Sequence, residues 1–267
     1  MLKRLFQRSR TAPPVEPRVA GGPPAVPRGV RVYAVGDVHG RLDLLVAMEA
    51  LIEADRREHG RFQDVLIVHL GDLVDRGFES RKVLDHLLAT GGDGPARVML
   101  LGNHDLWLRE FTAAEVTDPE QTASWMRFGG DATLLSYGVK LDLRKPEPDR
   151  FDAARRELQD RFPPAHAALL GSLDLAFGFG DYFFCHAGIR PDIALERQSE
   201  ADLLWIREPF LSWAGEWGKI VVHGHTVEEA PVTRVNRIGI DTGACWTGKL
   251  TCLVLAGTER RFLQTGR

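Results

Sequence analysis

The chain has 267 residues, of which 44% are hydrophobic and 27% are charged. This composition suits one large or two small soluble domains with a sizeable core, and it excludes a chain that is disordered throughout. The net charge of −3 lacks the basic excess typical of sequence-independent nucleic-acid binders, so we expect no nucleic-acid partner. Three cysteines without a C-x-x-C pair indicate neither a disulfide framework nor a cysteine zinc site, which favours a cytoplasmic location.

Residues 1–30 differ in composition from the rest of the chain. They hold six of the fifteen prolines and six basic side chains against a single acid, Glu16. The apolar stretch of a secretory signal is missing, and no apolar run approaches the roughly 20 residues of a membrane-spanning helix. We expect a disordered basic tail, for which docking to a partner or a membrane surface is the alternative role. Subtracting the tail's +5 from the total of −3 leaves −8 for residues 31–267.

Strand and helix patterns alternate from Val30 onward. Short apolar runs typical of buried strands are each followed by a stretch in which apolar residues recur at helical spacing. In chain order these segments are 30–35, 42–60, 65–70, 80–89, 97–101 and a helix from about Asp105. Alternation of this kind predicts a layered α/β fold.

The second half of the chain is rich in strand signals, after a segment with weaker periodicity. Residues 112–172 contain several prolines and Gly129-Gly130, and we interpret them as a mostly helical insertion. Gly178 and Gly180 are interpreted as a turn between strands. Strands are expected at 175–177, 182–185, 219–222, 232–235, 237–240 and 250–255. Residues 31–267 are therefore expected to form one domain.

A cluster of metal-capable side chains follows each of five strand signals. For a single cluster of this kind, helix capping is as good an explanation as metal binding. Five such clusters in succession predict a metal site. Folds of the α/β class place their sites at the carboxyl ends of strands. The clusters are GDVHG at 36–40, GDLVDRG at 71–77, GNHD at 102–105, CHAG at 185–188 and HGHT at 223–226.

The residue types in these clusters indicate the chemistry. Asp37 and His39 are two positions apart, so in an extended segment both side chains point the same way and can bind one ion. Asp72 has two carboxylate oxygens and can bridge two cations. A donor set without thiolate suits Mn²⁺, Fe or Zn²⁺, and a pair of such ions suits hydrolysis of a phosphate ester. The remaining candidates are one amide and two imidazoles: Asn103, His186 and His225.

These motifs, in this order, resemble the phosphoprotein-phosphatase branch of the calcineurin-like metallophosphoesterases, of the bacterial serine/threonine protein phosphatase type. The resemblance covers about residues 31–256. It implies an αββα sandwich of two mixed β-sheets flanked by helices, with a dinuclear metal site at the strand carboxyl ends. A metal-bridging hydroxide would attack phosphorus directly. The implied ligands are Asp37 and His39 for the first metal, Asp72 as the bridge, and Asn103, His186 and His225 for the second.

The resemblance also implies roles for the residues around the metals. His104 would be the general acid that protonates the leaving alkoxide, and Asp75 would hold it in the protonated state. Arg76 would clamp two phosphate oxygens with its planar fork, and Asn103 would contact the phosphate as well. Arg207 resembles the second phosphate-binding arginine of bacterial members, although an ion pair with a neighbouring acid explains it too.

Other residues near these motifs have open roles. His223 lies two positions before His225, so it could approach the metals or lie behind their ligands. The Trp125–Asp131 stretch resembles an insertion near the substrate mouth of bacterial members. Four tryptophans either line that mouth or pack in the core: Trp205, Trp213, Trp217 and Trp246.

Two functions follow from the resemblance, together with a third that lacks catalysis. The expected function is a phosphomonoesterase acting on phosphorylated serine or threonine, which Asp75 and the segments 205–207 and 223–226 favour. The alternative is a symmetrical bis(5'-nucleosyl)-tetraphosphatase, which Asp105 and the segment 241–251 favour. A binding module without activity is the third, and the complete set of expected ligands argues against it.

Overall fold

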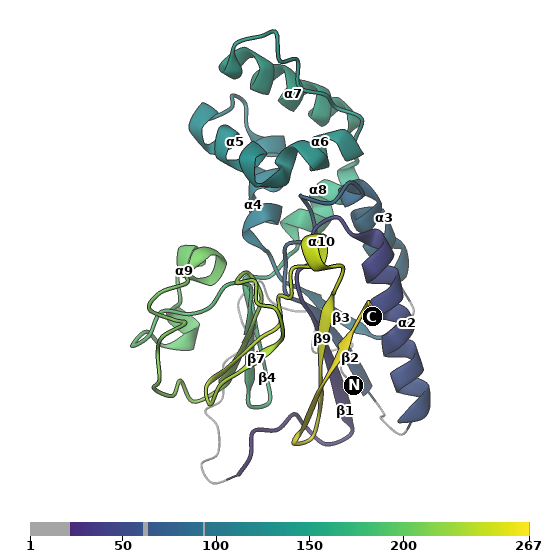
Figure 1. Ribbon diagram of the computed structural model, residues 1–267, viewed down its shortest axis with the longest axis vertical. Coiled ribbons are helices and arrows are strands. Elements are labelled where there is room, and N and C mark those ends of the chain that lie inside the picture. Colours follow the sequence, from purple (N-terminus) through teal and green to yellow (C-terminus); the bar gives the residue numbers. More distant parts are fainter. Residues whose placement is uncertain (1–21, 61–63, 93, 267) are drawn as a thin grey trace.

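The computed structural model describes residues 22–60, 64–92 and 94–266 (Figure 1). Residues 1–21, which hold most of the predicted tail, lie outside the described residues. The last residues of the predicted tail are described, and they pack against the sheets. Val26 is buried, and its N–H donates to the carbonyl oxygen of Gly257 at 3.0 Å. The N–H of Ala25 donates to a carboxylate oxygen of Asp181 at 2.9 Å. The folded part therefore begins before the predicted boundary at residue 30, because Val26 supplies an apolar contact.

The first sheet contains five strands in the order β10-β9-β1-β2-β3. Strands β1, β2 and β3 run parallel to one another. Strand β9 pairs antiparallel with both β1 and β10. Strand β1 is buried along its whole length, which explains its run of valines and other apolar residues. The bounds are β1 Val30–Val35, β2 Asp64–His69, β3 Ala96–Met99, β9 Thr251–Ala256 and β10 Glu259–Gln264.

The second sheet also contains five strands, in the order β4-β5-β6-β8-β7. Here β5, β6 and β8 run parallel, and the two edge strands β4 and β7 are antiparallel to their neighbours. Both sheets are therefore mixed, as the resemblance implied. The bounds are β4 Ala176–Phe179, β5 Tyr182–Cys185, β6 Ile220–His223, β7 Val232–Thr233 and β8 Arg237–Gly239.

Alternating side chains along β1 belong to two different cores, as the pleat of a strand requires. Val32 lies in the core between the sheets, where Phe184 of the second sheet also lies. Tyr33 points to the opposite face and belongs to the core that is shared with α2 (Leu42–Glu58) and α3 (Ser80–Thr90). The first sheet is thus buried on one face by the second sheet and on the other by helices.

The outer face of the second sheet has a smaller core of its own. Phe183 and Val221 pack there with Phe210 and with residues of α9 (Glu200–Trp205), which follows a short turn, η2 (Leu195–Arg197). The layers are therefore helices, sheet, sheet and helix. This arrangement confirms the predicted α/β sandwich.

A group of helices stands beyond the carboxyl ends of β1, β2 and β3 (Figure 1). Helix α4 begins directly after β3, and the chain then forms further helices where the insertion was expected before it returns to β4. The short helix α10, Ala244–Thr247, lies at the same end of the sheets. The bounds are α4 Asn103–Ala113, α5 Pro119–Trp125, η1 Met126–Gly130, α6 Asp131–Ser136, α7 Glu147–Arg161 and α8 Pro164–Gly171.

Four elements have no counterpart in the sequence-based expectations: η2, α9, α10 and β10. Strand β10 begins with Glu259-Arg260-Arg261 and lies at the edge of the first sheet, so its charged residues hide the apolar alternation of a strand. The strand expected at 232–235 is shorter than predicted, because β7 contains only Val232–Thr233.

A buried ion-pair network connects α2 with the central strand β1 and the edge strand β10 of the first sheet. The Asp55 carboxylate accepts hydrogen bonds from Arg31 at 2.7 Å and from the Tyr33 hydroxyl at 2.6 Å, and it also pairs with Arg261. Arg31 and Asp55 side chains are only 2% and 3% exposed. Burial opposes ionisation of Asp55, but the hydrogen bonds from Arg261, Tyr33 and Arg31 hold its carboxyl pKa below the usual value.

We expect Asp55→Asn to lower the free energy of unfolding by about 3 kcal/mol, because it removes the charge that neutralises a buried arginine. Urea unfolding at pH 7 measures this loss. Since the folded pKa lies below the unfolded value, the difference between the two proteins should shrink as the pH falls below about 4. The exposed pair of Asp142 and Arg144 provides a control, and Asp142→Asn should change stability little. An Asp55→Asn protein with the same free energy of unfolding as the parent would contradict this account.

Candidate functional site

Loops at the carboxyl ends of strands in both sheets bring the candidate residues together. The loop after β1 holds Asp37 and His39, and the start of α4 holds Asn103 and His104. Most of these side chains are buried, whereas Arg76 and His225 are partly exposed. The others follow their strands in the same way: Asp72, Asp75 and Arg76 after β2, His186 after β5 and His225 after β6.

The backbone at this site is unusual. Within the described residues, six non-glycine residues have a positive φ, and five of them are candidate site residues. Side chains at such positions cost about 1–3 kcal/mol each and cluster at functional sites. Those five residues are His39, Asp72, Asp75, Arg76 and His225.

Asp72 lies at the centre of the cluster. Its Oδ2 is 3.4 Å from Nε2 of His39, and its Oδ1 is 3.4 Å from Nε2 of His186. The Oδ1 of Asn103 is 2.9 Å from the same nitrogen of His186. Two groups of side chains that could each hold a metal ion share this carboxylate: His39, Asp72 and His104, and Asp72, His186 and His225.

Hydrogen bonds orient two of the imidazoles for metal binding. The Nδ1–H of His39 donates to the carbonyl oxygen of Val74 at 2.9 Å, and that of His186 donates to the carbonyl oxygen of Leu70 at 3.0 Å. The Nε2 lone pairs of both rings therefore face Asp72. Burial lowers the pKa of both His186 and His225, which favours the neutral imidazole that binds metals.

Asp37 provides a direct indication that a cation fits here. Its Oδ2 accepts the N–H of His225 at 3.0 Å, but its buried Oδ1 has no hydrogen-bond partner. Asp241 is a second buried carboxyl beside it, with an unpartnered Oδ2. Burial, followed by the charges of Asp241 and Asp72, raises the pKa of Asp37 well above its usual value. A divalent cation would relieve this repulsion, so the donor set fits a metal ion.

Asp241 was not among the residues that the sequence identified as ligands. Its carboxyl pKa is raised to about 6, mainly by burial. It lies within the Asp241-Thr242-Gly243 segment, which was noted only as an indication of the substrate class. The helix α10 that begins three residues later was not predicted, so the only available signal was an acid in a loop, which is common and therefore weak.

His104 and Asp75 form a buried pair next to the metal-capable cluster. The Nδ1–H of His104 donates to Asp75 Oδ2 at 2.6 Å. The indole N–H of Trp125 donates to the same oxygen at 2.7 Å, and the hydroxyl of Thr133 donates to Oδ1 at 2.6 Å. Trp125 and Thr133 were not predicted in this role. They hold the carboxylate in one orientation and leave Nε2 of His104 directed toward the cluster.

Both predicted phosphate-binding arginines lie at the site. The Arg76 guanidinium donates to Nε2 of His39 at 2.5 Å and to Nε2 of His104 at 3.0 Å. Arg207 is exposed and donates to the hydroxyl of Thr226 at 3.0 Å, one residue after His225. The side chain of Arg207 therefore binds the loop that contains His225. Its hydrogen bond goes to Thr226 and not to the neighbouring acid Glu208.

His223 lies away from the metal-capable cluster. Its ring packs edge-on against Phe210, with centroids 4.9 Å apart, in the outer core of the second sheet. Its Nδ1–H donates to the carbonyl oxygen of Gly224 at 3.0 Å, and neither metal-capable group includes it. Trp217 stacks on the same Phe210.

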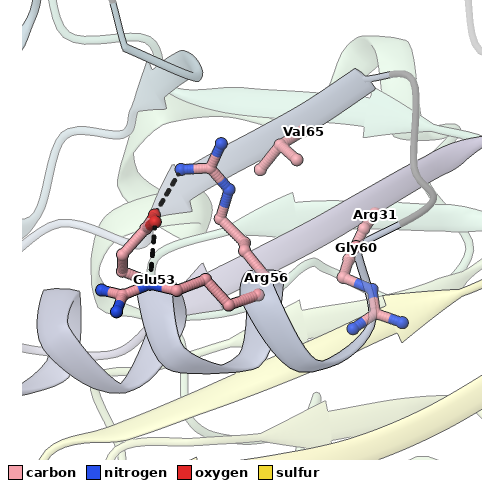
Figure 2. Close-up of a pocket in the computed structure, with 6 residues that line it drawn as sticks. Arg31, Glu53, Arg56, Gly60 and Val65 are labelled. Atoms are coloured by element: carbon pink, nitrogen blue, oxygen red, sulfur yellow. Dashed lines mark hydrogen bonds and ion pairs between the residues drawn. The ribbon is translucent and has the colours of Figure 1, made fainter.

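A basic pocket occurs near the end of α2, far from the strand ends that carry the cluster (Figure 2). It is lined by Arg31, Glu53, Arg56, Arg57, Gly60 and Val65. Arg56 and Arg57 both pair with Glu53, at 2.8 and 3.4 Å. Each arginine of the pocket has an acidic partner and none of the candidate site residues lines it, so this pocket is not the candidate site. Within the described residues no helix is long and apolar enough to cross a membrane.

Comparisons with known proteins agree with this geometry. A model of the calcineurin-like phosphoesterase family matches residues 30–245. A symmetrical bis(5'-nucleosyl)-tetraphosphatase from Cronobacter sakazakii is 26% identical, over 83% of this chain and 89% of the relative. A protein of the same name from Yersinia pestis is 45% identical over 76 residues, which cover 28% of this chain and 23% of the relative.

A crystal structure described as a candidate diadenosine tetraphosphatase has the same fold, with a TM-score of 0.60 and 21% identity. The match covers 92% of this chain and 100% of that one. The matched family model spans all the strand-end loops that carry the cluster. The chain therefore belongs to the calcineurin-like phosphoesterase family and is a metallophosphoesterase.

Proposed function

We propose that this metallophosphoesterase is a phosphomonoesterase that removes phosphate from serine and threonine side chains of proteins. The pairing of Asp75 with His104 carries the proposal. A positioned acid matters most when the leaving group is a strongly basic alkoxide, as it is for serine and threonine. His104 donates a proton from Nε2 to the leaving oxygen, and Asp75 stabilises the protonated ring from the other side.

Two divalent metal ions are the cofactors of this proposal, with Mn²⁺ as the first choice and Fe or Zn²⁺ as alternatives. When bound, such a pair makes a nucleophile from water at neutral pH and polarises phosphoryl oxygens. Asp72 contributes one oxygen to each side of the cluster, which suits a shared ligand. Asp37 and His39 hold the first ion, and Asn103, His186 and His225 hold the second.

The phosphate group is bound by side chains that already converge on the cluster. Arg76 presents a planar fork to the space next to His39 and His104, and a guanidinium binds two phosphate oxygens at once. The side-chain amide of Asn103, at the start of α4, also contacts the phosphate in this proposal. Arg207 approaches from the His225 side, so the two arginines would neutralise the phosphate from opposite sides.

Symmetrical cleavage of dinucleoside tetraphosphates is the second candidate, because the named relatives carry that activity in their names. Its leaving group is a nucleoside diphosphate, which departs as a stable anion and has less need of a proton. The presence of the Asp75 and His104 pair therefore favours the monoesterase. Asp105, which favoured the tetraphosphatase in sequence, accepts the N–H groups of Leu73 and Gly102 and so connects two loops.

We expect hydrolysis of p-nitrophenyl phosphate to require divalent metal. A chelator should abolish the rate, and Mn²⁺ should restore it. Mn²⁺ should also raise the Tm, because an ion that binds only the folded state stabilises it. Asp72→Asn should lose both the activity and the Mn²⁺-dependent rise in Tm, whereas the distant Asp142→Asn should keep both. Full activity in the chelator would rule out a metal-dependent reaction.

The role of His104 is tested by substrates that differ in leaving group. His104→Asn should lower kcat/KM about 10²- to 10⁴-fold for a phosphoserine peptide. The loss should be much smaller for p-nitrophenyl phosphate, because p-nitrophenolate leaves without a proton. Asp75→Asn should follow the same pattern, and the exposed His59→Asn should behave as the parent. Metal content, measured by elemental analysis, should stay unchanged; equal losses for both substrates would contradict the acid role.

A side-by-side assay separates the two candidate functions. We expect a higher kcat/KM for a phosphoserine peptide than for diadenosine tetraphosphate when both are measured with the Mn²⁺-loaded protein. The products are followed as inorganic phosphate and as ADP. If diadenosine tetraphosphate is cleaved to two ADP with a much higher kcat/KM than the peptide, the tetraphosphatase is the correct function and the monoesterase is not.

A further inference from the structure

Exposed aromatic side chains are concentrated around the candidate site. The described part of the chain has five exposed large aromatic side chains: Phe78, Phe128, Trp205, Trp246 and Phe262. Trp205 and Trp246 contact His225 and Arg76 of the site, and Phe128 stacks on Trp107, which contacts His104. The exposed fractions are 54% for Phe128, 39% for Trp205 and 63% for Trp246. Single exposed aromatic residues are ordinary, but a group of them marks a binding surface.

Two of these exposed rings, Phe128 and Trp205, form a continuous cluster with the half-buried Trp107 at its centre. Trp107 stacks on Phe128 with centroids 6.0 Å apart and an interplanar angle of 16°, and it meets Trp205 edge-on at 4.8 Å. Trp107 also contacts His104, at 5.1 Å between centroids, and Trp205 lies 6.4 Å from His225. We call Trp107, Phe128 and Trp205 the aromatic rim.

Trp246 lies on another side of the same site. The Arg76 guanidinium sits 4.7 Å from its ring centroid, in a cation–π contact. Trp246 is therefore partnered by a residue that faces the phosphate position. Among the described residues, no cation stacks on a ring of the aromatic rim, so its exposed rings offer flat apolar area beside His104.

We infer that the aromatic rim binds an aromatic ring carried by the leaving group of the substrate. The inference rests on the proposed function, because His104 marks the side from which the leaving group departs. Trp107 touches His104, so a leaving group protonated there lies against Trp107 and its neighbours Phe128 and Trp205. The ligand class is thus a phosphate ester whose organic part presents a flat ring. In the proposed phosphoprotein substrate this ring is an aromatic side chain next to the phosphorylated serine or threonine.

Benzyl phosphate and ethyl phosphate test this inference, because both release simple alkoxides and differ mainly in the ring. With the Mn²⁺-loaded protein we expect kcat/KM to be about tenfold higher for benzyl phosphate. Phe128→Leu and Trp205→Leu, which keep apolar volume, should bring that ratio close to one. Phe262→Leu removes an equally exposed ring on β10 and should leave the ratio unchanged. Thermal unfolding verifies that each variant is folded.

Two further comparisons sharpen the result. Cyclohexylmethyl phosphate is apolar but not flat, and it should lack the advantage of benzyl phosphate. An equal rate for these two esters, or a benzyl advantage that survives in both rim variants, would overturn the inference while leaving the monoesterase intact. Failure to hydrolyse any monoester would instead overturn the proposed function.

The natural source of the ring is tested with phosphoserine peptides that have either phenylalanine or leucine next to the phosphoserine, and with adenosine 5'-monophosphate. We expect the phenylalanine peptide to lose more rate than the leucine peptide in the rim variants. A larger loss with the nucleotide would overturn the peptide source in favour of a nucleobase reached across the ribose. Binding of benzylphosphonate, measured by calorimetry, should weaken in the same variants, which separates recognition of the ring from the chemical step. Unchanged binding and rates would overturn the inference.

Discussion

The rest of the site is arranged around the buried carboxylate of Asp72, which lies where several strand ends meet. For its two oxygens to face both His39 and His186, the loops after β1, β2 and β5 have to converge. The loop after β3 packs directly against Asp72. A Cβ on Gly102 would lie 2.1 Å from the backbone nitrogen of Asp72, so only glycine permits this approach. Asp72 itself has a φ of 49°, a conformation that costs free energy and that the rigid sheets must sustain.

The helical segment beyond the sheets is connected to the site through Asp75. Trp125 and Thr133 donate the hydrogen bonds that orient this carboxylate, and the carbonyl oxygen of Gly129 accepts the N–H of Arg76 at 3.0 Å. These helices therefore support the proposed acid and the phosphate-binding arginine, whereas the sheets support the metal-capable residues. The two parts of the chemistry depend on different parts of the fold.

The contrast between His223 and His225 shows how local geometry overrides spacing. Two residues apart on a strand, both would share one face, which left the role of His223 open in the sequence. Strand β6 ends at His223, however, and His225 has a φ of 61°. The backbone turns between them, so His223 packs on Phe210 while His225 joins the group around Asp72. A left-handed residue of this kind has no reliable signature in the sequence, since histidine adopts it only occasionally.

The sequence by itself determined which metal-capable side chains follow the strands, the order of the strand-end loops and the layered α/β class. These properties are local, because the type of donor belongs to each residue and a strand covered on both faces, such as Val30–Val35, appears as an apolar run. Only the tertiary structure decided that Asp241 lies beside Asp37, that Trp125 and Thr133 hold Asp75 from 50 and 58 positions away, and that Trp107 packs against His104. The physical reason is that these contacts depend on how the sheets and helices pack, and the packing of distant segments leaves no periodicity in the chain.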